Sequence, residues 1–281
     1  NEGYRASVAP LDPRASAAHP APGQAEAAAR LLALLDGGDL SRPGVARRLQ
    51  DPLSLRCAAP VLGAGLAALR AARAAVELEL AACGDNPLIL ADEDMVLPNA
   101  NFDVTHLALA FETLGLALAR VAALGAERMA KLMSPGSSEL PRFLALRQDG
   151  RNGFATVQKT VAALVAEIQH RAMPMPVVVI PVADRVEDYA TMATAAVDKA
   201  AEIVARLRLL AATELIVAAQ AVDLRGNISL GRGTAAVHQA VRAHVPPLDE
   251  DRPCAPDIEA VDTMIRDGAL AAVLQLVLGT P

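Results

Sequence analysis

Aromatic side chains are almost absent from this chain of 281 residues. Phenylalanine, tyrosine and tryptophan together make up 2% of it, and tryptophan does not occur. Apolar residues still account for 53%, so a core must be built mainly from alanine, leucine and valine. Small side chains at that density favour helices that pack at short range. The composition therefore predicts an all-α protein, and the length allows one or two domains, of which we expect one, a single helical domain over residues 1–281.

Cysteine is scarce as well. Cys57, Cys83 and Cys254 form no C-x-x-C pair, and the five histidines are scattered without the spacing of metal ligands. We therefore expect no structural zinc or other metal. Few and distant cysteines are typical of reduced thiols in a cytoplasmic protein.

Charge and hydropathy argue against two further classes. The net charge of -6, with a pI near 5.4, includes no basic stripe, so nucleic acid is not an expected partner. No uninterrupted apolar run approaches the roughly 18 residues of a membrane span, since even the run 107–119 contains Glu112. The sequence also shows no secretory leader pattern, and we expect a soluble cytoplasmic protein that does not bind membranes.

What the sequence does contain is a series of stretches with apolar residues at helical spacing. One helix is predicted from Gly23 to Leu35, because the pair Gly37-Gly38 marks its end. Further helices are predicted over about 61–83, 103–133, 153–172, 184–224, 234–244 and 258–278. At the start of the helix over 103–133, Asp103 can cap the first turn and Phe102 can act as a hydrophobic staple.

The segments between these helices predict turns and extended chain. Gly84-Asp85-Asn86-Pro87 ends a helix, and the prolines and β-branched residues of 173–181 favour an extended segment. No segment alternates with period two for long enough to predict a sheet. We expect an elongated bundle of long up-and-down helices, whose remaining apolar faces meet other subunits.

Arg56 is the most informative single residue, because it lies in apolar surroundings directly before a long helix. A guanidinium group keeps its proton, so if the fold buries it the site must supply a carboxylate or phosphate. That anion can be a substrate, or it can be a structural Asp or Glu of the same fold.

Five short motifs, in order along the chain, resemble the aromatic amino acid ammonia-lyase family. They are Gln50-Asp-Pro-Leu-Ser-Leu-Arg56-Cys57, Gly84-Asp-Asn-Pro-Leu88, Asn101-Phe102, Leu140-Pro-Arg-Phe-Leu144 and Val186-Glu-Asp-Tyr-Ala-Thr-Met192. The histidine ammonia-lyase branch is the more similar, since Pro22-Gly23-Gln24 and Asp223-Leu224-Arg225 also resemble it.

The resemblance implies an all-α homotetramer in which three subunits assemble each active site. It also implies a methylidene-imidazolone electrophile, which forms when an internal Ala-Ser-Gly cyclises. This chain contains no Ala-Ser-Gly, and Ala15-Ser16, for example, is followed by alanine. The group is therefore expected from an N-terminal half, on a separate polypeptide or in a removed segment, together with the family's tyrosine base and an asparagine near the electrophile.

The resemblance assigns four substrate-binding residues and no catalytic residue within this chain. Arg56 matches the arginine that holds the substrate carboxylate, and Gln50 matches a glutamine that lines the pocket, although it could equally cap the following turn. Phe102 matches a phenylalanine near the electrophile. Glu187 matches a glutamate that contacts the polar end of the substrate, and its simpler interpretation is an acid in the first turn of a helix. Asn86 is expected only to brace its loop.

Several positions depart from the family pattern. Leu53 stands where the family has a tyrosine, so one hydrogen-bond donor is lost. Ala59-Pro60 replaces Pro-Gln, and Asp103 and Tyr189 each replace a histidine. Together these changes argue against ordinary histidine breakdown, because a pocket that recognises imidazole needs matched polar partners.

Three hypotheses follow. The first is the C-terminal half of a carbon-nitrogen lyase that eliminates ammonia from an aromatic or related α-amino acid and is inactive without the N-terminal half. The second is a catalytically silent structural subunit, with Leu53 as a trace of lost chemistry. The third is an aminomutase or another elimination on the same scaffold.

Overall fold

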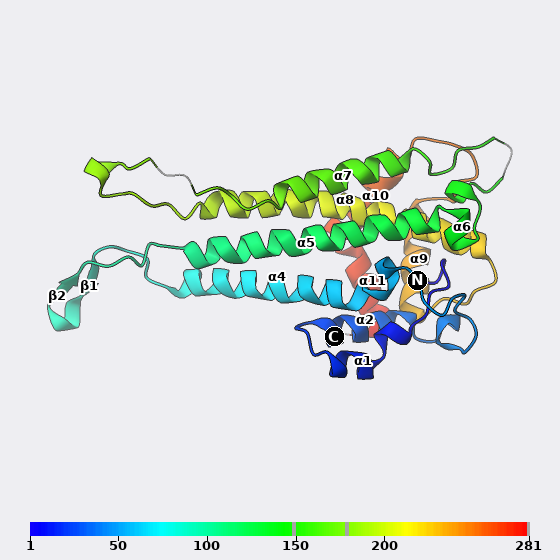
Figure 1. Cartoon of the computed structure of the whole chain (residues 1–281), viewed down its shortest axis with the longest axis horizontal. Coiled ribbons are helices and arrows are strands. Elements are labelled where there is room, and N and C mark those ends of the chain that lie inside the picture. The colour runs from blue at the N-terminus through cyan, green and yellow to red at the C-terminus, as the bar shows by residue number, and fades with distance from the viewer. Residues whose placement is uncertain (148–149, 178–179, 280–281) are drawn as a thin grey trace.

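The computed structural model describes residues 1–147, 150–177 and 180–279, and most of them are helical (Figure 1). The helices are α1 Pro13–Ala18, α2 Gln24–Leu35, α3 Leu53–Arg56, α4 Ala58–Ala81, α5 Thr105–Leu132, α6 Pro135–Ser138, α7 Val157–Arg171, α8 Ala193–Arg225, α9 Arg232–His244, α10 Ala255–Arg266 and α11 Ala269–Leu278. The strands are β1 Leu88–Leu90 and β2 Met95–Leu97. The predicted all-α class and the elongated bundle are confirmed.

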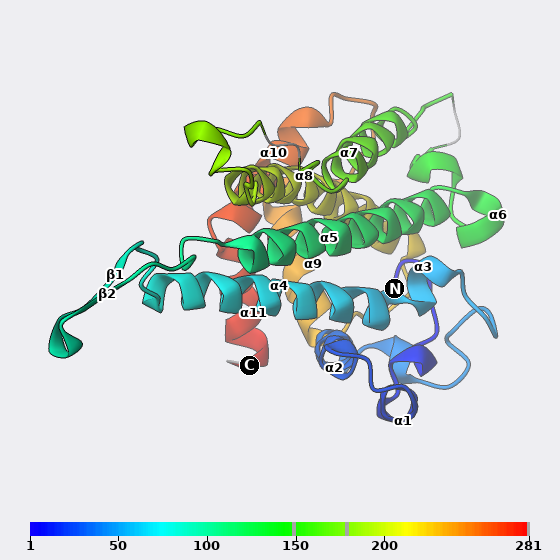
Figure 2. The same cartoon turned by 60° about the vertical axis from the view of Figure 1, so that its left-hand side comes forward.

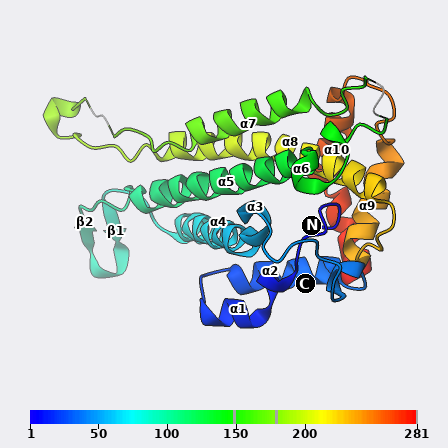
Figure 3. The same ribbon diagram turned by 45° about the vertical axis from the view of Figure 1, so that its right-hand side comes forward.

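Four long helices, α4, α5, α7 and α8, lie side by side along the length of the molecule (Figures 1 and 3). Helix α5 packs on the other three. The buried residues of α4 are all alanine or glycine: Ala58, Ala59, Gly63, Gly65, Ala68, Ala72 and Ala75. On α5, a Cβ at Gly115 would lie 3.2 Å from Cδ1 of Ile203. The helices therefore approach closely, as the scarcity of aromatic residues predicts.

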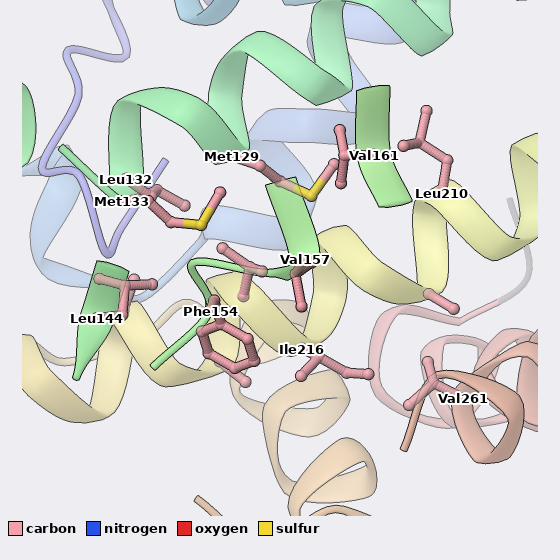
Figure 4. Packing of buried hydrophobic residues seen from close by; sticks show 14 of the residues in the cluster. Met129, Leu132, Met133, Leu144, Phe154, Val157, Val161, Leu210, Ile216 and Val261 are labelled. Carbon is pink, nitrogen blue, oxygen red and sulfur yellow. The ribbon is translucent and has the colours of Figure 1, made fainter. Parts of the chain in front are cut away.

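The main core lies where α5, α7, α8 and α10 meet, and Figure 4 shows part of it. Met129 of α5, Ile168 of α7, Ile203 and Val217 of α8, and Val261 of α10 have no exposed surface. Helices α9 and α11 pack on each other and cross the long helices toward the end opposite the hairpin (Figure 3), and α2 lies beside α4 (Figure 2). The first residues of the chain enter this end, where Tyr4 is 1% exposed.

One prediction that the structure contradicts is the absence of a sheet. Strands β1 and β2 form an antiparallel hairpin beyond the end of α4, with Leu88 opposite Leu97 and Leu90 opposite Met95. Each strand has only three residues, which is too short for a period-two pattern. The turn between them contains Asp94 with a positive φ of 51°.

Two helix boundaries were also wrong. The predicted helix 184–224 begins only at Ala193, because Met192 adopts a left-handed conformation with φ of 56°. Residues 183–185 form a 3-10 turn instead, and Val182 pairs with Glu187 in an isolated bridge. The predicted helix 258–278 is two helices, since Gly268 with φ of 78° separates α10 from α11. The segment 173–181 is non-helical as predicted, apart from residues 178–179, which lie outside the described residues.

At the start of α5 one of two predicted interactions is present. The carboxylate of Asp103 accepts a hydrogen bond from the Thr105 amide at 3.0 Å. Phe102, however, is 60% exposed, so it does not act as a hydrophobic staple. Helix α5 is also long and apolar enough to cross a membrane by length and composition alone. We interpret it as the central helix of the bundle, because it packs on α4, α7 and α8.

We expect core leucines to stabilise the chain far more than the exposed leucines on the same long helices. Leu210 of α8 is 2% exposed and Leu80 of α4 is 82% exposed. Leu210→Ala should lower the free energy of unfolding by about 2–5 kcal/mol, whereas Leu80→Ala should change it by less than about 0.5 kcal/mol. Urea denaturation followed by circular dichroism measures both, and equal losses would show that this core is wrongly placed.

Candidate functional site

Arg56 is the last residue of α3, a single turn that leads directly into α4. Its side chain is half-buried, and its Nε donates a hydrogen bond to the carbonyl oxygen of Asp51 at 2.8 Å. Among the described residues, no carboxylate forms an ion pair with it. A structural Asp or Glu that would pair with Arg56 is therefore not present among the described residues. The guanidinium is held through one nitrogen, and its terminal nitrogens are left for another acceptor.

The residues before Arg56 divide into exposed and buried positions. Gln50 is exposed and Leu53 is 62% exposed, so both face outward at this end of the bundle. Asp51 is 4% exposed, and its Oδ2 accepts a hydrogen bond from the amide of Ser7 at 2.7 Å. Asp51, to which sequence reasoning assigned no role, therefore fixes the turn that Gln50 was considered to cap.

Phe102 and Glu187 lie at the opposite end of the bundle from Arg56. Arg56 precedes α4, whereas Phe102 precedes α5 and Glu187 lies between α7 and α8, at the end that carries the hairpin (Figures 1 and 3). The 24 residues of α4 separate the two ends, a length of about 36 Å at 1.5 Å per residue. A single chain therefore does not bring the four predicted site residues together. Glu187 is also not in the first turn of a helix, so that interpretation of the residue is wrong.

A charged cluster anchors the loop that carries Glu187. Glu112 of α5 and Lys199 of α8 form an ion pair in which both side chains are less than 15% exposed. Glu112 Oε1 also accepts from the amide of Met175 at 3.0 Å, and Lys199 donates to the carbonyl of Met173 at 2.7 Å. Further along the loop, the Tyr189 hydroxyl lies 2.9 Å from that of Thr105. Hydrogen bonds thus hold the loop to α5 and α8.

A group of arginines surrounds α6 at the Arg56 end of the molecule. Arg47, Arg48 and Arg225 donate to carbonyl oxygens of α6, and Arg47 also donates to Tyr4 and pairs with Glu139. Burial, together with the neighbouring Arg47 and Arg5, lowers the pKa of Arg225 from its usual value. Their spacing in the sequence gave no signal of this cluster. The cluster lies at the same end of the molecule as Arg56.

The turn after α4 behaves as the sequence predicts. Asn86 Oδ1 accepts from the Asn99 amide at 2.9 Å, and Asn99 donates to the carbonyl of Asp85 at 3.0 Å. The Asn86 side chain therefore braces the base of the hairpin. Within residues 1–147, 150–177 and 180–279, no group of three or more His, Cys, Asp or Glu side chains is arranged to hold a metal ion.

The model of the aromatic amino acid lyase family matches residues 1–243. The chain belongs to this family. Among curated relatives, the histidine ammonia-lyase of Anaeromyxobacter dehalogenans is 39% identical over 273 residues, which are 96% of this chain and 54% of the relative. That of Symbiobacterium thermophilum is 37% identical and covers 99% of this chain and 55% of the relative. The chain spans about half the length of the curated relatives it matches.

Several solved structures share the fold of this chain. The ergothioneine-degrading ergothionase of Treponema denticola superposes with a TM-score of 0.90 at 34% identity, over 96% of this chain and 54% of the other. Histidine ammonia-lyase of Trypanosoma cruzi superposes with a TM-score of 0.89 at 29% identity, over 98% of this chain and 52% of the other. Tyrosine aminomutase of Streptomyces globisporus superposes with a TM-score of 0.89 at 28% identity, over 100% of this chain and 57% of the other. This aromatic amino acid lyase chain is therefore similar to both ammonia-lyases and an aminomutase.

The anchoring of the loop over 173–192 generates a test. Glu112→Gln removes the charge that pairs with Lys199 and weakens the attachment of Met173 and Met175. We expect trypsin to cleave after the exposed Arg185 roughly three- to tenfold faster in this variant, because local opening controls access to the bond. Glu77→Gln, which breaks an exposed pair with Arg73, should leave the rate unchanged. Equal rates for the wild type and Glu112→Gln would contradict the anchor.

Proposed function

We propose that this chain is the C-terminal half of an ammonia-lyase-type carbon-nitrogen lyase that binds the carboxylate of an aromatic or related α-amino acid. The observation that carries the proposal is the state of Arg56. Its guanidinium is half-buried, is held by Nε to a backbone carbonyl, and has no ion-pair partner among the described residues. Membership of the aromatic amino acid lyase family supplies the reaction class.

Arg56 has the geometry to orient a substrate. A planar guanidinium whose Nε is already engaged still offers its terminal nitrogens, which suit a carboxylate of matching shape. Binding the carboxylate at a defined point places the amino group and the β-carbon of the substrate in a fixed position. The arginines around α6 add a positive field that favours the approach of an anion to this end.

The remaining site residues would come from other copies of the chain. Phe102 and Glu187 are exposed at the end distant from Arg56, so a second copy running in the opposite direction would bring them to the Arg56 of the first. Large apolar side chains that are at least 44% exposed gather on the hairpin, on the segment that joins it to α5 and on the loop over 173–192: Ile89, Met95, Val96, Leu97, Phe102, Met173, Val177, Ile180, Val182, Val186 and Tyr189. Such a surface favours association with other subunits, as a homotetramer or with a second kind of chain.

The electrophile would come from the N-terminal half, because no Ala-Ser-Gly occurs in this chain. When bound in the site, a methylidene-imidazolone supplies an electron-poor carbon that assists the loss of ammonia. Two buried polar atoms beside Arg56, Oδ1 of Asp51 and Oγ of Ser54, make no hydrogen bond with the described residues. Both atoms are enclosed by this chain itself, so a donor from a neighbouring segment would reach them only if the turn shifted on assembly.

The substituted pocket positions bear on the reaction. Leu53 is exposed near Arg56 and offers no donor to a carboxylate or to the prosthetic group. The tyrosine aminomutase among the structural neighbours supports an aminomutase as the second candidate function. A catalytically silent subunit is the third, and it predicts that neither Leu53→Tyr nor Arg56→Ala changes any measured activity of the full assembly.

Purification from the native source tests the two-part enzyme. We expect a polypeptide with an Ala-Ser-Gly that has lost water, either attached to this chain or co-purifying with it, and mass spectrometry detects both cases. The unsaturated acid formed from an aromatic α-amino acid is followed by its ultraviolet absorbance. An assembly that contains no such modified tripeptide would contradict the proposal.

Substitution of Arg56 tests the proposed carboxylate site in that assembly. Arg56→Ala should lower kcat/KM by roughly 30- to 1,000-fold, equivalent to about 2–4 kcal/mol, because the substrate carboxylate loses its charged partner. Arg73→Ala, which removes an arginine whose side chain is 78% exposed, is the control and should have no effect. If Arg56→Ala changes kcat/KM no more than Arg73→Ala does, Arg56 does not bind the substrate.

A further inference from the structure

An ion pair between α5 and α8 lies next to α3, on the side that faces the core. Arg128 of α5 and Glu214 of α8 make two parallel contacts, from Nε to Oε1 and from Nη2 to Oε2, the latter at 2.9 Å. Their side chains are only 17% and 25% exposed. A Cβ at Gly125 would lie 2.8 Å from Glu214 Oε2, so the glycine makes room for this carboxylate. The bidentate geometry and the cleared space describe a well-defined pair.

The same guanidinium reaches a third element. Arg128 Nη1 donates to the carbonyl oxygen of Ser54 in α3 at 3.4 Å. Ser54 is 6% exposed, and its neighbour Leu55, 7% exposed, packs into the main core. Leu55, Arg128 and Glu214 also line one cavity of about 230 Å³ beneath α3 and the start of α4. The ion pair therefore supports the turn whose last residue is Arg56.

The turn needs such support because it is short. A helix of four residues makes too few internal hydrogen bonds to hold its own conformation. From one side it is held by Asp51, whose carboxylate bonds the amide of Ser7 and whose carbonyl accepts from Arg56. From the core side, the polar contact to its backbone comes from Arg128.

We propose that the Arg128–Glu214 pair positions α3, and through it the guanidinium of Arg56, for binding the carboxylate of the substrate. The proposal rests on the function proposed above and adds two positioning residues that do not touch the substrate. A bidentate contact tolerates little displacement, so loss of the pair should weaken the carboxylate contact even though Arg56 remains. The effect should be confined to ligands that carry a carboxylate.

The test uses the complete enzyme and compares two ligands by calorimetry. They are the α-amino acid that the enzyme converts and the amine that lacks only its carboxylate, for example L-histidine with histamine or L-phenylalanine with phenethylamine. For Glu214→Gln we expect the Kd of the amino acid to rise about tenfold or more, while the Kd of the amine changes less than twofold. KM should rise by a larger factor than kcat falls, and Glu214→Asp should recover part of the affinity.

A matched pair elsewhere on α8 provides the control. Arg208 of α8 and Asp262 of α10 also form two contacts, at 2.8 and 3.4 Å, with side chains 30% and 10% exposed, and this pair does not touch α3. Asp262→Asn should destabilise the protein without changing the affinity for either ligand. If Glu214→Gln does not fold, Gly125→Ala keeps both charges but crowds the carboxylate, and a rise of at least threefold in the Kd of the amino acid alone is expected.

The outcomes separate the two proposals. The positioning role is overturned if a variant binds both ligands more weakly by the same factor. It is also overturned if Glu214→Gln and Gly125→Ala both bind the amino acid as tightly as the wild type. If Arg56→Ala itself leaves the affinity for the amino acid unchanged, the function proposed for Arg56 fails first. If Arg56→Ala weakens binding and the Glu214 and Gly125 variants do not, only the inference about the ion pair is lost.

Discussion

Close contact between alanine and glycine faces is the constraint on which the rest of this structure depends. The buried residues of α4 are alanine and glycine alone, and α5 contributes Gly115 and Gly125 at points where a larger residue would crowd a side chain of α8. Small residues bury little apolar area each, so the helices must be long to accumulate enough contact. That length is also what places Arg56 and the pair Phe102 and Glu187 at opposite ends of one chain.

Polar contacts fix the segments that the apolar core does not reach. The Arg128–Glu214 pair lies behind α3, Glu112 and Lys199 hold the loop over 173–192, and the arginines around α6 satisfy its free carbonyl groups. Each of these contacts involves a charged group bonded to a backbone atom outside regular hydrogen bonding. In a bundle with so few large side chains, such contacts substitute for packing in defining where loops and short turns lie.

The two ends of the molecule differ in character. The Arg56 end carries several arginines and is closed by the first residues of the chain. The opposite end carries exposed apolar side chains on the hairpin and the loop over 173–192. Because the length of α4 separates Arg56 from Phe102 and Glu187, a single copy of this chain does not bring these three residues into one pocket.

The sequence by itself predicted most of the helices and their approximate ends, because apolar periodicity and turn residues such as Gly226 and Asn86 act locally. The family was indicated separately, by the resemblance of five short motifs in order along the chain. The sequence also identified Arg56 and its neighbours as candidate site residues. It did not predict the hairpin, whose strands are too short for a pattern, or the late start of α8 at Ala193. Only the tertiary structure decided that Phe102 is exposed, that Asp51 is buried and that Arg128 reaches both Glu214 and α3, because these facts depend on contacts between residues far apart in the chain.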